Sequence, residues 1–183
     1  MSVGQKRATL EDLYNEPGKA ELIGGRIVQF MATGYKPHRV ASRIFRSLDD
    51  YATQIGVGEA FTDNMGFAVK ELPSGRESFS PDAAYYSGPL PPNLMRFIEG
   101  APTFAVEVRS ENDYSDAAEE EMADKRADYF EAGTKVVWDV DPVAECIHKY
   151  TDLTHKITFL RGQTADAEPA VLGWKVDVDW IFS

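Results

Sequence analysis

The order of elements predicted by the sequence indicates an α/β or α+β fold, in which helices flank a mixed central β-sheet. Apolar residues recur at helical spacing in two stretches, 37–53 and 116–131. Short apolar runs typical of strands lie before, between and after these helices. This order favours a mixed sheet over a doubly wound parallel sheet. The 183 residues are most simply one domain, spanning 1–183.

Capping and turn residues predict the first elements. Thr9 is a helix N-cap with the acidic Asp12 three positions later, and Pro17-Gly18 ends this short helix. Residues 21–30 have the pattern of a β-hairpin with Gly24-Gly25 at the turn.

Beyond the hairpin, predicted strands alternate with the two long helices. Glycines end each helix, and a group of prolines interrupts the chain between residues 89 and 92. The expected strands are 59–62, 66–71, one opening at 82, 103–109, 135–140, 145–150, 156–161 and a strand or tail at 169–181, with a short helix near 92–98.

Composition and charge restrict the class of protein. The net charge of −11 weighs against nucleic-acid binding through bulk electrostatics, although it does not exclude a local basic groove. Cys146 is the single cysteine, so neither an intrachain disulfide nor a multi-cysteine zinc cluster can form. Residues 1–7 lack an apolar run behind their charges, and no stretch is apolar enough to span a bilayer. We therefore expect a cytoplasmic protein without a membrane partner.

Glu107 is the most unusual residue of the predicted strand 103–109. Side chains alternate across a sheet, so Glu107 shares a face with Ala105 and Arg109, within an otherwise apolar strand. A buried carboxylate is costly unless a cation, a metal or hydrogen bonds compensate it. A metal site is one explanation, and a structural ion pair with Arg109 or Lys125 is the other.

Two further residues could join Glu107. Lys125 falls on the inward stripe of the helix 116–131, where a lysine either extends to solvent or serves a polar site. Asp82 follows Pro81 at the start of an apolar run, a position that by itself is typical of a turn. Two carboxylates at the ends of neighbouring strands can hold a hard cation such as Mg²⁺.

Other candidates carry a weaker signal. Glu21 lies just before the hairpin turn and is either a solvated charge or an additional metal ligand. Arg39, Arg43 and Arg46 form one basic stripe that could contact phosphates, although a solvated helix face is the more common meaning of such a stripe. The sequence has no glycine-rich phosphate loop, no His-Glu-x-x-His motif and no nucleophile elbow.

Several segments, in this order and spacing, resemble the Uma2 family, a group of largely bacterial proteins in the PD-(D/E)xK restriction-endonuclease-like superfamily. The resemblance extends from about Thr9 to Pro142 and implies a restriction-endonuclease-like core. The segments that carry it are Glu21–Ile27, Pro37-His38, Ser80–Tyr86, Val106–Ser110, Lys125–Tyr129 and Gly133–Pro142.

The resemblance also implies roles for the site residues. Asp82 and Glu107 correspond to the metal ligands, with the carbonyl of Val108 and Glu21 as further candidates for binding Mg²⁺ or Mn²⁺. The superfamily pattern has a lysine two residues after the glutamate, where this chain has Arg109. Lys125 matches the lysine that family members carry on the following helix. Arg109 could instead stabilise a phosphate oxygen, but a guanidinium does not replace an ammonium closely.

Two functions from different classes therefore remain open. The first is a metal-dependent endonuclease that hydrolyses DNA phosphodiester bonds, with Asp82, Glu107, Lys125 and Arg109 at its site and Arg39 and Arg43 as weak DNA contacts. The second is a catalytically inactive, homo-oligomeric binding or regulatory module of the same fold, favoured by the acidic charge and by Arg109.

A homodimer is the expected assembly, because restriction-type nucleases often pair to cut both strands. The apolar C-terminal segment could pack on such a partner or, as is more frequent, close the core of its own chain. Its large residues are Trp174, Trp180, Ile181 and Phe182.

Overall fold

A six-stranded mixed sheet forms the centre of the computed structural model, which describes residues 6–183. Residues 1–7, for which the sequence predicts no signal peptide, lie largely outside the described residues. The strand order is β11-β10-β9-β8-β6-β3, and all neighbours are antiparallel except β8 and β9. The predicted mixed α+β architecture is thus confirmed. The strands are β3 (Glu59–Thr62), β6 (Ala83–Tyr86), β8 (Phe104–Val108), β9 (Val136–Asp141), β10 (Cys146–Tyr150) and β11 (Lys156–Phe159).

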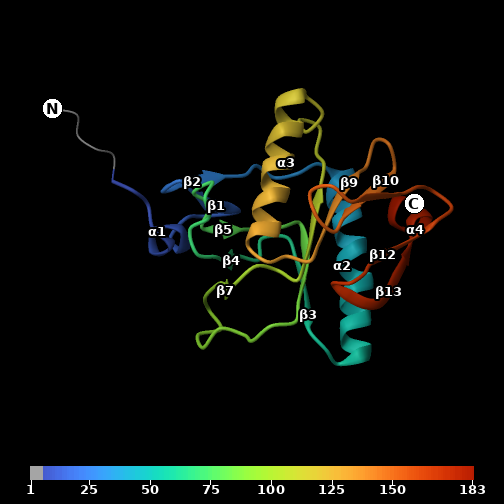
Figure 1. Ribbon diagram of the computed structural model, residues 1–183, viewed down its shortest axis with the longest axis horizontal. Coiled ribbons are helices and arrows are strands. Elements are labelled where there is room, and N and C mark those ends of the chain that lie inside the picture. Colours follow the sequence, from blue (N-terminus) through green and yellow to red (C-terminus); the bar gives the residue numbers. More distant parts are fainter. Residues whose placement is uncertain (1–5) are drawn as a thin grey trace.

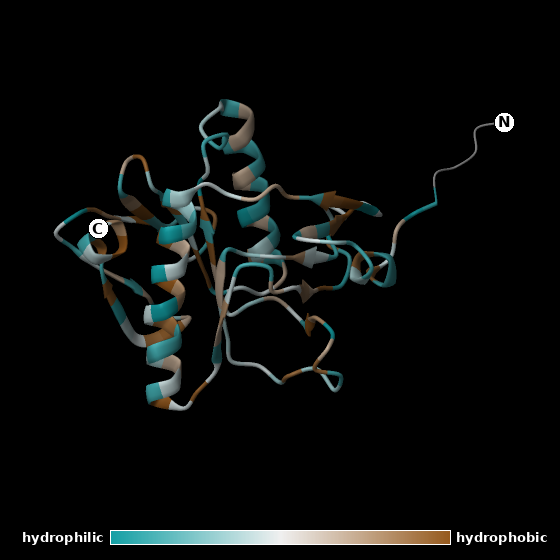
Figure 2. Ribbon diagram, turned by 180° about the vertical axis from the view of Figure 1, so that it is seen from behind, coloured by the Kyte–Doolittle hydropathy of each residue, from teal (hydrophilic) through white to brown (hydrophobic). Residues whose placement is uncertain are grey.

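The two long helices lie on opposite faces of this sheet (Figure 1). Helix α2 (Tyr35–Ile55) ends at Gly56, whose φ of 65° is the left-handed conformation that glycine adopts without strain. Helix α3 (Asp116–Glu131) connects the parallel strands β8 and β9, and its N-cap Ser115 accepts a hydrogen bond from Ala118 N–H. Polar residues colour much of both helices, while the strands between them are more apolar (Figure 2). In the described part of the chain, no helix is both long and apolar enough for a bilayer.

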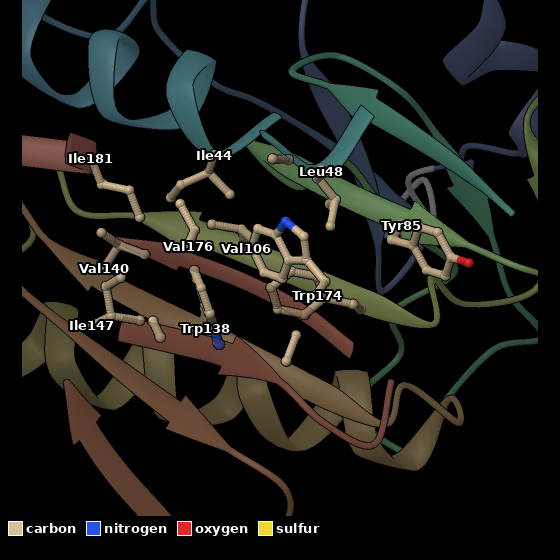
Figure 3. Packing of buried hydrophobic residues seen from close by; sticks show 14 of the residues in the cluster. Ile44, Leu48, Tyr85, Val106, Trp138, Val140, Ile147, Trp174, Val176 and Ile181 are labelled. Carbon is tan, nitrogen blue, oxygen red and sulfur yellow. The ribbon is translucent and has the colours of Figure 1, made fainter. Parts of the chain in front are cut away.

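The larger core lies between the sheet and α2 (Figure 3). Ile44 and Leu48 of α2 are fully buried, and the Trp138 and Trp174 rings pack with centroids 5.2 Å apart. Trp174 lies in β13 (Val171–Asp177), which covers this face together with β12 (Thr164–Ala167) and α4 (Val178–Phe182). The apolar tail therefore closes the core of its own chain, although Trp180 remains 38% exposed.

A second core lies on the α3 face, where Tyr129 stacks on Phe79 with centroids 4.2 Å apart. A small sheet supports it, made of β4 (Phe67–Ala68), β5 (Ser78–Phe79) and β7 (Ile98–Glu99). The short helix predicted near 92–98 is wrong. That segment makes turns and then enters β7, which pairs in parallel with β4.

The N-terminal elements pack beside α3 and form the predicted helix and hairpin. Helix α1 (Leu10–Tyr14) has a complete capping box between Thr9 and Asp12. Strands β1 (Ala20–Ile23) and β2 (Arg26–Gln29) meet at Gly24-Gly25. The hairpin is anchored because Leu22 N–H donates to Ser78 Oγ at 2.7 Å.

Candidate active site

A cavity of about 720 Å³ opens where β8 ends, between the beginning of α2 and the first half of α3. Segment 30–38, the end of β8 and the α3 residues 118–126 supply most of its lining. Asp82, Glu107 and Lys125 lie in this lining together with Val108 and Arg109. The structure thus brings together most of the residues that the sequence singled out.

Backbone hydrogen bonds fix Asp82 beside the end of β8. The Asp82 N–H donates to the Val106 carbonyl at 3.0 Å, and Oδ2 of Asp82 accepts from Val108 N–H at 2.7 Å. In a strand, the N–H and C=O of one residue point to the same side. The Val108 carbonyl is therefore directed to the side on which Asp82 lies.

Lys125 joins two glutamates that are far apart in the sequence. Its Nζ lies 2.9 Å from Glu107 Oε1 and 3.0 Å from Glu21 Oε1. Glu21 is completely buried, and its other partners are the Arg76 guanidinium and Ser80 N–H. Protein donors therefore bind both oxygens of Glu21, which makes Glu21 a support for Lys125.

The two glutamates have opposite pKa shifts. Burial raises the pKa of Glu21, but the attraction of Lys125 and Arg76 outweighs burial and lowers it below the usual value. Burial also raises the pKa of Glu107, and repulsion from Asp82 adds to it, so Lys125 offsets only part of the rise. Burial lowers the pKa of Lys125, yet Glu107 and Glu21 together raise it. The two glutamates therefore favour the ammonium form of Lys125.

Tyr129 also holds Glu107, a role that the sequence analysis did not assign to it. Its O–H donates to Glu107 Oε1 at 2.6 Å, and its side chain is fully buried. Tyr129 follows Lys125 by four positions on α3, so one helix face presents both groups to Glu107. That spacing is the signal in the sequence that could have revealed this role.

Arg109 forms its ion pairs with acidic residues other than Asp82 and Glu107. It binds Asp139 with two hydrogen bonds of 2.7 Å and also contacts Glu119 at 2.8 Å. Arg126 reaches the same Asp139 at 3.1 Å. Of the two ion pairs considered for Glu107, the pair with Lys125 is present, whereas Arg109 binds this other acidic group.

Lys19 is the main residue that sequence reasoning missed. Its Nζ lies 2.6 Å from Asp82 Oδ1 and 2.8 Å from Asp63 Oδ1, and it lines the cavity. Lys19 lies immediately before β1 and two positions before Glu21. Its carbonyl accepts from Phe30 N–H at 2.9 Å and so extends the hairpin, which places its side chain on the same face as that of Glu21. This alternation is a signal, but the partner Asp82 is 63 residues away.

Comparison with known proteins gives the family of the chain. The model of the family Uma2, described as "Putative restriction endonuclease", matches residues 7–179. The chain belongs to the Uma2 family. The crystal structure of "a putative nuclease belonging to DUF820" from Anabaena variabilis ATCC 29413 is similar, with a TM-score of 0.72. That likeness covers 95% of this chain and 97% of the other at 17% identity, so it shows a shared fold. No curated protein matches this chain.

The donor atoms of this Uma2 protein fit a hard divalent cation. Asp82, Glu107 and the Val108 carbonyl are all oxygen donors, the type that Mg²⁺ and Mn²⁺ prefer. Within residues 6–183, no group of three or more His, Cys, Asp or Glu side chains is arranged to hold a metal. Metal binding by Asp82, Glu107 and the Val108 carbonyl therefore stays a prediction.

The arginines predicted as weak DNA contacts lie outside the cavity lining of the Uma2 protein. Arg43 donates to the carbonyls of Trp180, Ile181 and Ser183 at the end of α4. Arg39 is exposed on the same helix. The structure does not bring either residue to the carboxylates, and contact with DNA stays a prediction for both.

Proposed function

We propose that this Uma2 protein is a Mg²⁺- or Mn²⁺-dependent endonuclease that hydrolyses DNA phosphodiester bonds. The observation that carries the proposal is the pair Asp82 and Glu107, fixed at the end of β8 in one cavity with the Lys125 ammonium. The family description and the fold of the Anabaena variabilis protein support it.

In this proposal, Asp82, Glu107 and the Val108 carbonyl hold the divalent cation. When bound, the cation supplies an activated water and neutralises charge on the scissile phosphate. Lys125 stabilises the negative charge that develops on the phosphoryl oxygens, because Glu107 and Glu21 keep it protonated. Glu21 and Arg76 are positioning residues. Glu21 forms an ion pair with Lys125, and Arg76 binds Glu21.

The acidic cavity makes the cation a requirement for substrate binding. Acidic side chains outnumber basic ones in the lining, and Asp139 and Glu119 already bind the Arg109 guanidinium. A phosphate therefore meets a net negative field until a divalent cation compensates it.

The alternative is a non-catalytic binding or regulatory module of the same fold. It gains support from the ion pairs, because Lys19 and Lys125 already neutralise Asp82 and Glu107 without any metal. Homodimerisation belongs to both proposals. Sedimentation equilibrium measures it directly, and a monomer at micromolar concentration would argue against paired cutting of both strands.

A plasmid-nicking assay tests the proposed activity. Purified wild-type protein, Asp82→Asn and Glu107→Gln are incubated with supercoiled DNA in Mn²⁺, in Mg²⁺ and in chelator. Glu121→Gln is the matched control, since Glu121 lines the same cavity on α3 but is exposed. We expect metal-dependent nicking by wild type and Glu121→Gln alone.

The same assay distinguishes the alternative. If none of the proteins nicks supercoiled, linear or single-stranded DNA, the binding module becomes the better account. Full activity in Glu107→Gln would contradict the assignment of the site.

A further inference from the structure

We infer that Lys19 is a catalytic residue of this site, which competes with the divalent cation for Asp82 and, once displaced, contacts the substrate phosphate. The inference rests on the proposed nuclease function and adds to it a residue outside the family motif. It starts from the position of the Lys19 ammonium between two carboxylates.

Lys19 and a divalent cation compete for the same carboxylate. Oδ2 of Asp82 accepts the Val108 N–H, and Oδ1 contacts Lys19 Nζ at 2.6 Å. A metal ion bound to this carboxylate would lie close to the ammonium, and the two positive charges would repel each other strongly at that distance. Binding of the ion therefore favours displacement of Lys19 from Asp82.

Asp63 can remain the ion-pair partner of Lys19 after Lys19 leaves Asp82. It follows β3, contacts Lys19 Nζ at 2.8 Å and lines the same cavity. Lys19 can therefore leave Asp82 and keep one carboxylate partner. The Phe30 ring, whose centroid lies 5.9 Å from Lys19 Nζ, also stabilises the ammonium through a cation–π interaction.

Lys19 is also accessible to a substrate. Its side chain is 17% exposed, and it lines the cavity that holds Asp82 and Glu107. With Arg109 bound to Asp139, Lys19 and Lys125 are the cations that directly flank the two candidate ligands.

Titration of Mn²⁺ without DNA tests the competition. We expect Lys19→Met to bind Mn²⁺ about tenfold more tightly than wild type, because a competing charge next to the ligand is lost. Lys19→Gln keeps a polar partner for Asp82 and should show the same change if Lys19→Met does not fold. Lys19→Arg keeps the charge and should bind no more tightly than wild type.

The matched control is Lys36→Met. Lys36 lines the same cavity but pairs with Glu145, so this variant loses equal charge away from Asp82. Its Mn²⁺ affinity should stay within about twofold of wild type. An unchanged affinity in Lys19→Met and Lys19→Gln would overturn the inference, as would an equal gain in Lys36→Met.

Cleavage at saturating Mn²⁺ tests the contact with substrate. Lys19→Gln should cut DNA more slowly than wild type even though it binds the metal more tightly, and unchanged cleavage would overturn this contact. A wild-type protein that binds Mn²⁺ and cuts no DNA would refute both the proposed nuclease and the substrate contact. The Mn²⁺ titration would still decide separately whether Lys19 competes for Asp82.

Discussion

Glu21 and Glu107 contact the same lysine, but the fold shifts the pKa of these two glutamates in opposite directions. Glu21 is completely buried between Lys125 and Arg76, and these cations lower its pKa despite the burial. Glu107 shares Lys125 but also lies near Asp82, and its pKa is raised by burial and by that repulsion. Glu21 is therefore a structural charge, whereas the fold disfavours the ionised form of Glu107.

Replacing Glu21 by glutamine should destabilise the protein by about 3 kcal/mol, because it leaves the Arg76 guanidinium and the Lys125 ammonium without their common partner. Urea unfolding measures the change. Since the folded-state pKa of Glu21 is lowered, its contribution is present above the ordinary value of 4.5 and is lost as the pH falls through the lower folded value. The difference in free energy of unfolding between wild type and Glu21→Gln should therefore become smaller at acidic pH.

The exposed Glu71 provides the control for this prediction. It pairs with Arg7 at the surface, so Glu71→Gln should leave the urea midpoint unchanged. If Glu21→Gln is as stable as wild type at neutral pH, Glu21 is not the structural charge described above.

Glu107→Gln should behave in the opposite way, with stability equal to or above wild type at neutral pH. The raised folded-state pKa means that the ionised form of Glu107 disfavours folding above that pKa, and the amide removes this cost. The Tyr129 O–H can still donate to the new side-chain carbonyl. Thermal unfolding measures the effect, and a large loss of stability would contradict it.

At the level of single residues, the sequence revealed that Glu107 is a buried charge in need of partners, but it identified only some of the residues that form the site. Alternation on one strand correctly indicated that Glu107 needs a partner, and helical spacing placed Lys125 on the inward face. Lys19 and Arg76 could not be found in this way. Their partners lie more than 50 residues away, and only the folded hairpin brings them together.

At the level of elements, the contact between α2 and α4 explains the position of Arg43. The guanidinium donates to carbonyls at the C-terminal end of α4, where helix carbonyls lack partners within the helix. It also lies 5.8 Å from the Trp180 ring centroid. Arg43 therefore fastens the last helix over the larger core.

Arg43→Met should lower the free energy of unfolding by about 1 kcal/mol, the usual contribution of such hydrogen bonds. Arg39→Met, on an exposed part of the same helix, should not change it. Thermal or urea unfolding of the two variants provides the test. Equal stability of both would show that Arg43 does not hold α4.

Elements with strong local signals were predicted from the sequence, whereas strands β5 and β7 and their pairing with β4 were not. The Thr9 cap indicated α1, helical spacing over 116–131 indicated α3, and Gly24-Gly25 indicated the first hairpin, all correctly. The two-residue strands β4, β5 and β7 exist only through pairing with one another. Segment 92–98 was wrongly predicted as a helix for this reason, because tertiary pairing outweighs local propensity there.

At the level of the whole molecule, the net charge of −11 opposes the approach of DNA. The proposed function therefore predicts DNA binding that requires a divalent cation. Fluorescence anisotropy with labelled DNA should show binding in Ca²⁺ and none in chelator. The salt dependence should also be shallow, with a slope of about −3 or less in magnitude, because few cavity cations are free of acidic partners.

Equally tight binding in chelator, or a steep salt dependence, would contradict this prediction. It would place the DNA contact on a basic surface such as the α2 stripe of Arg39 and Arg46, away from the carboxylates.

Calorimetric titration of Mn²⁺ into wild-type protein, Asp82→Asn and Glu121→Gln tests whether Asp82 holds a divalent cation in the cavity. We expect one site in wild type and in Glu121→Gln, and a loss of affinity of at least about tenfold in Asp82→Asn. Wild-type affinity in Asp82→Asn, or no binding by any of the three at millimolar Mn²⁺, would contradict it. In the second case, the lysines that bind Asp82 and Glu107 would be structural partners and the cavity would hold no metal.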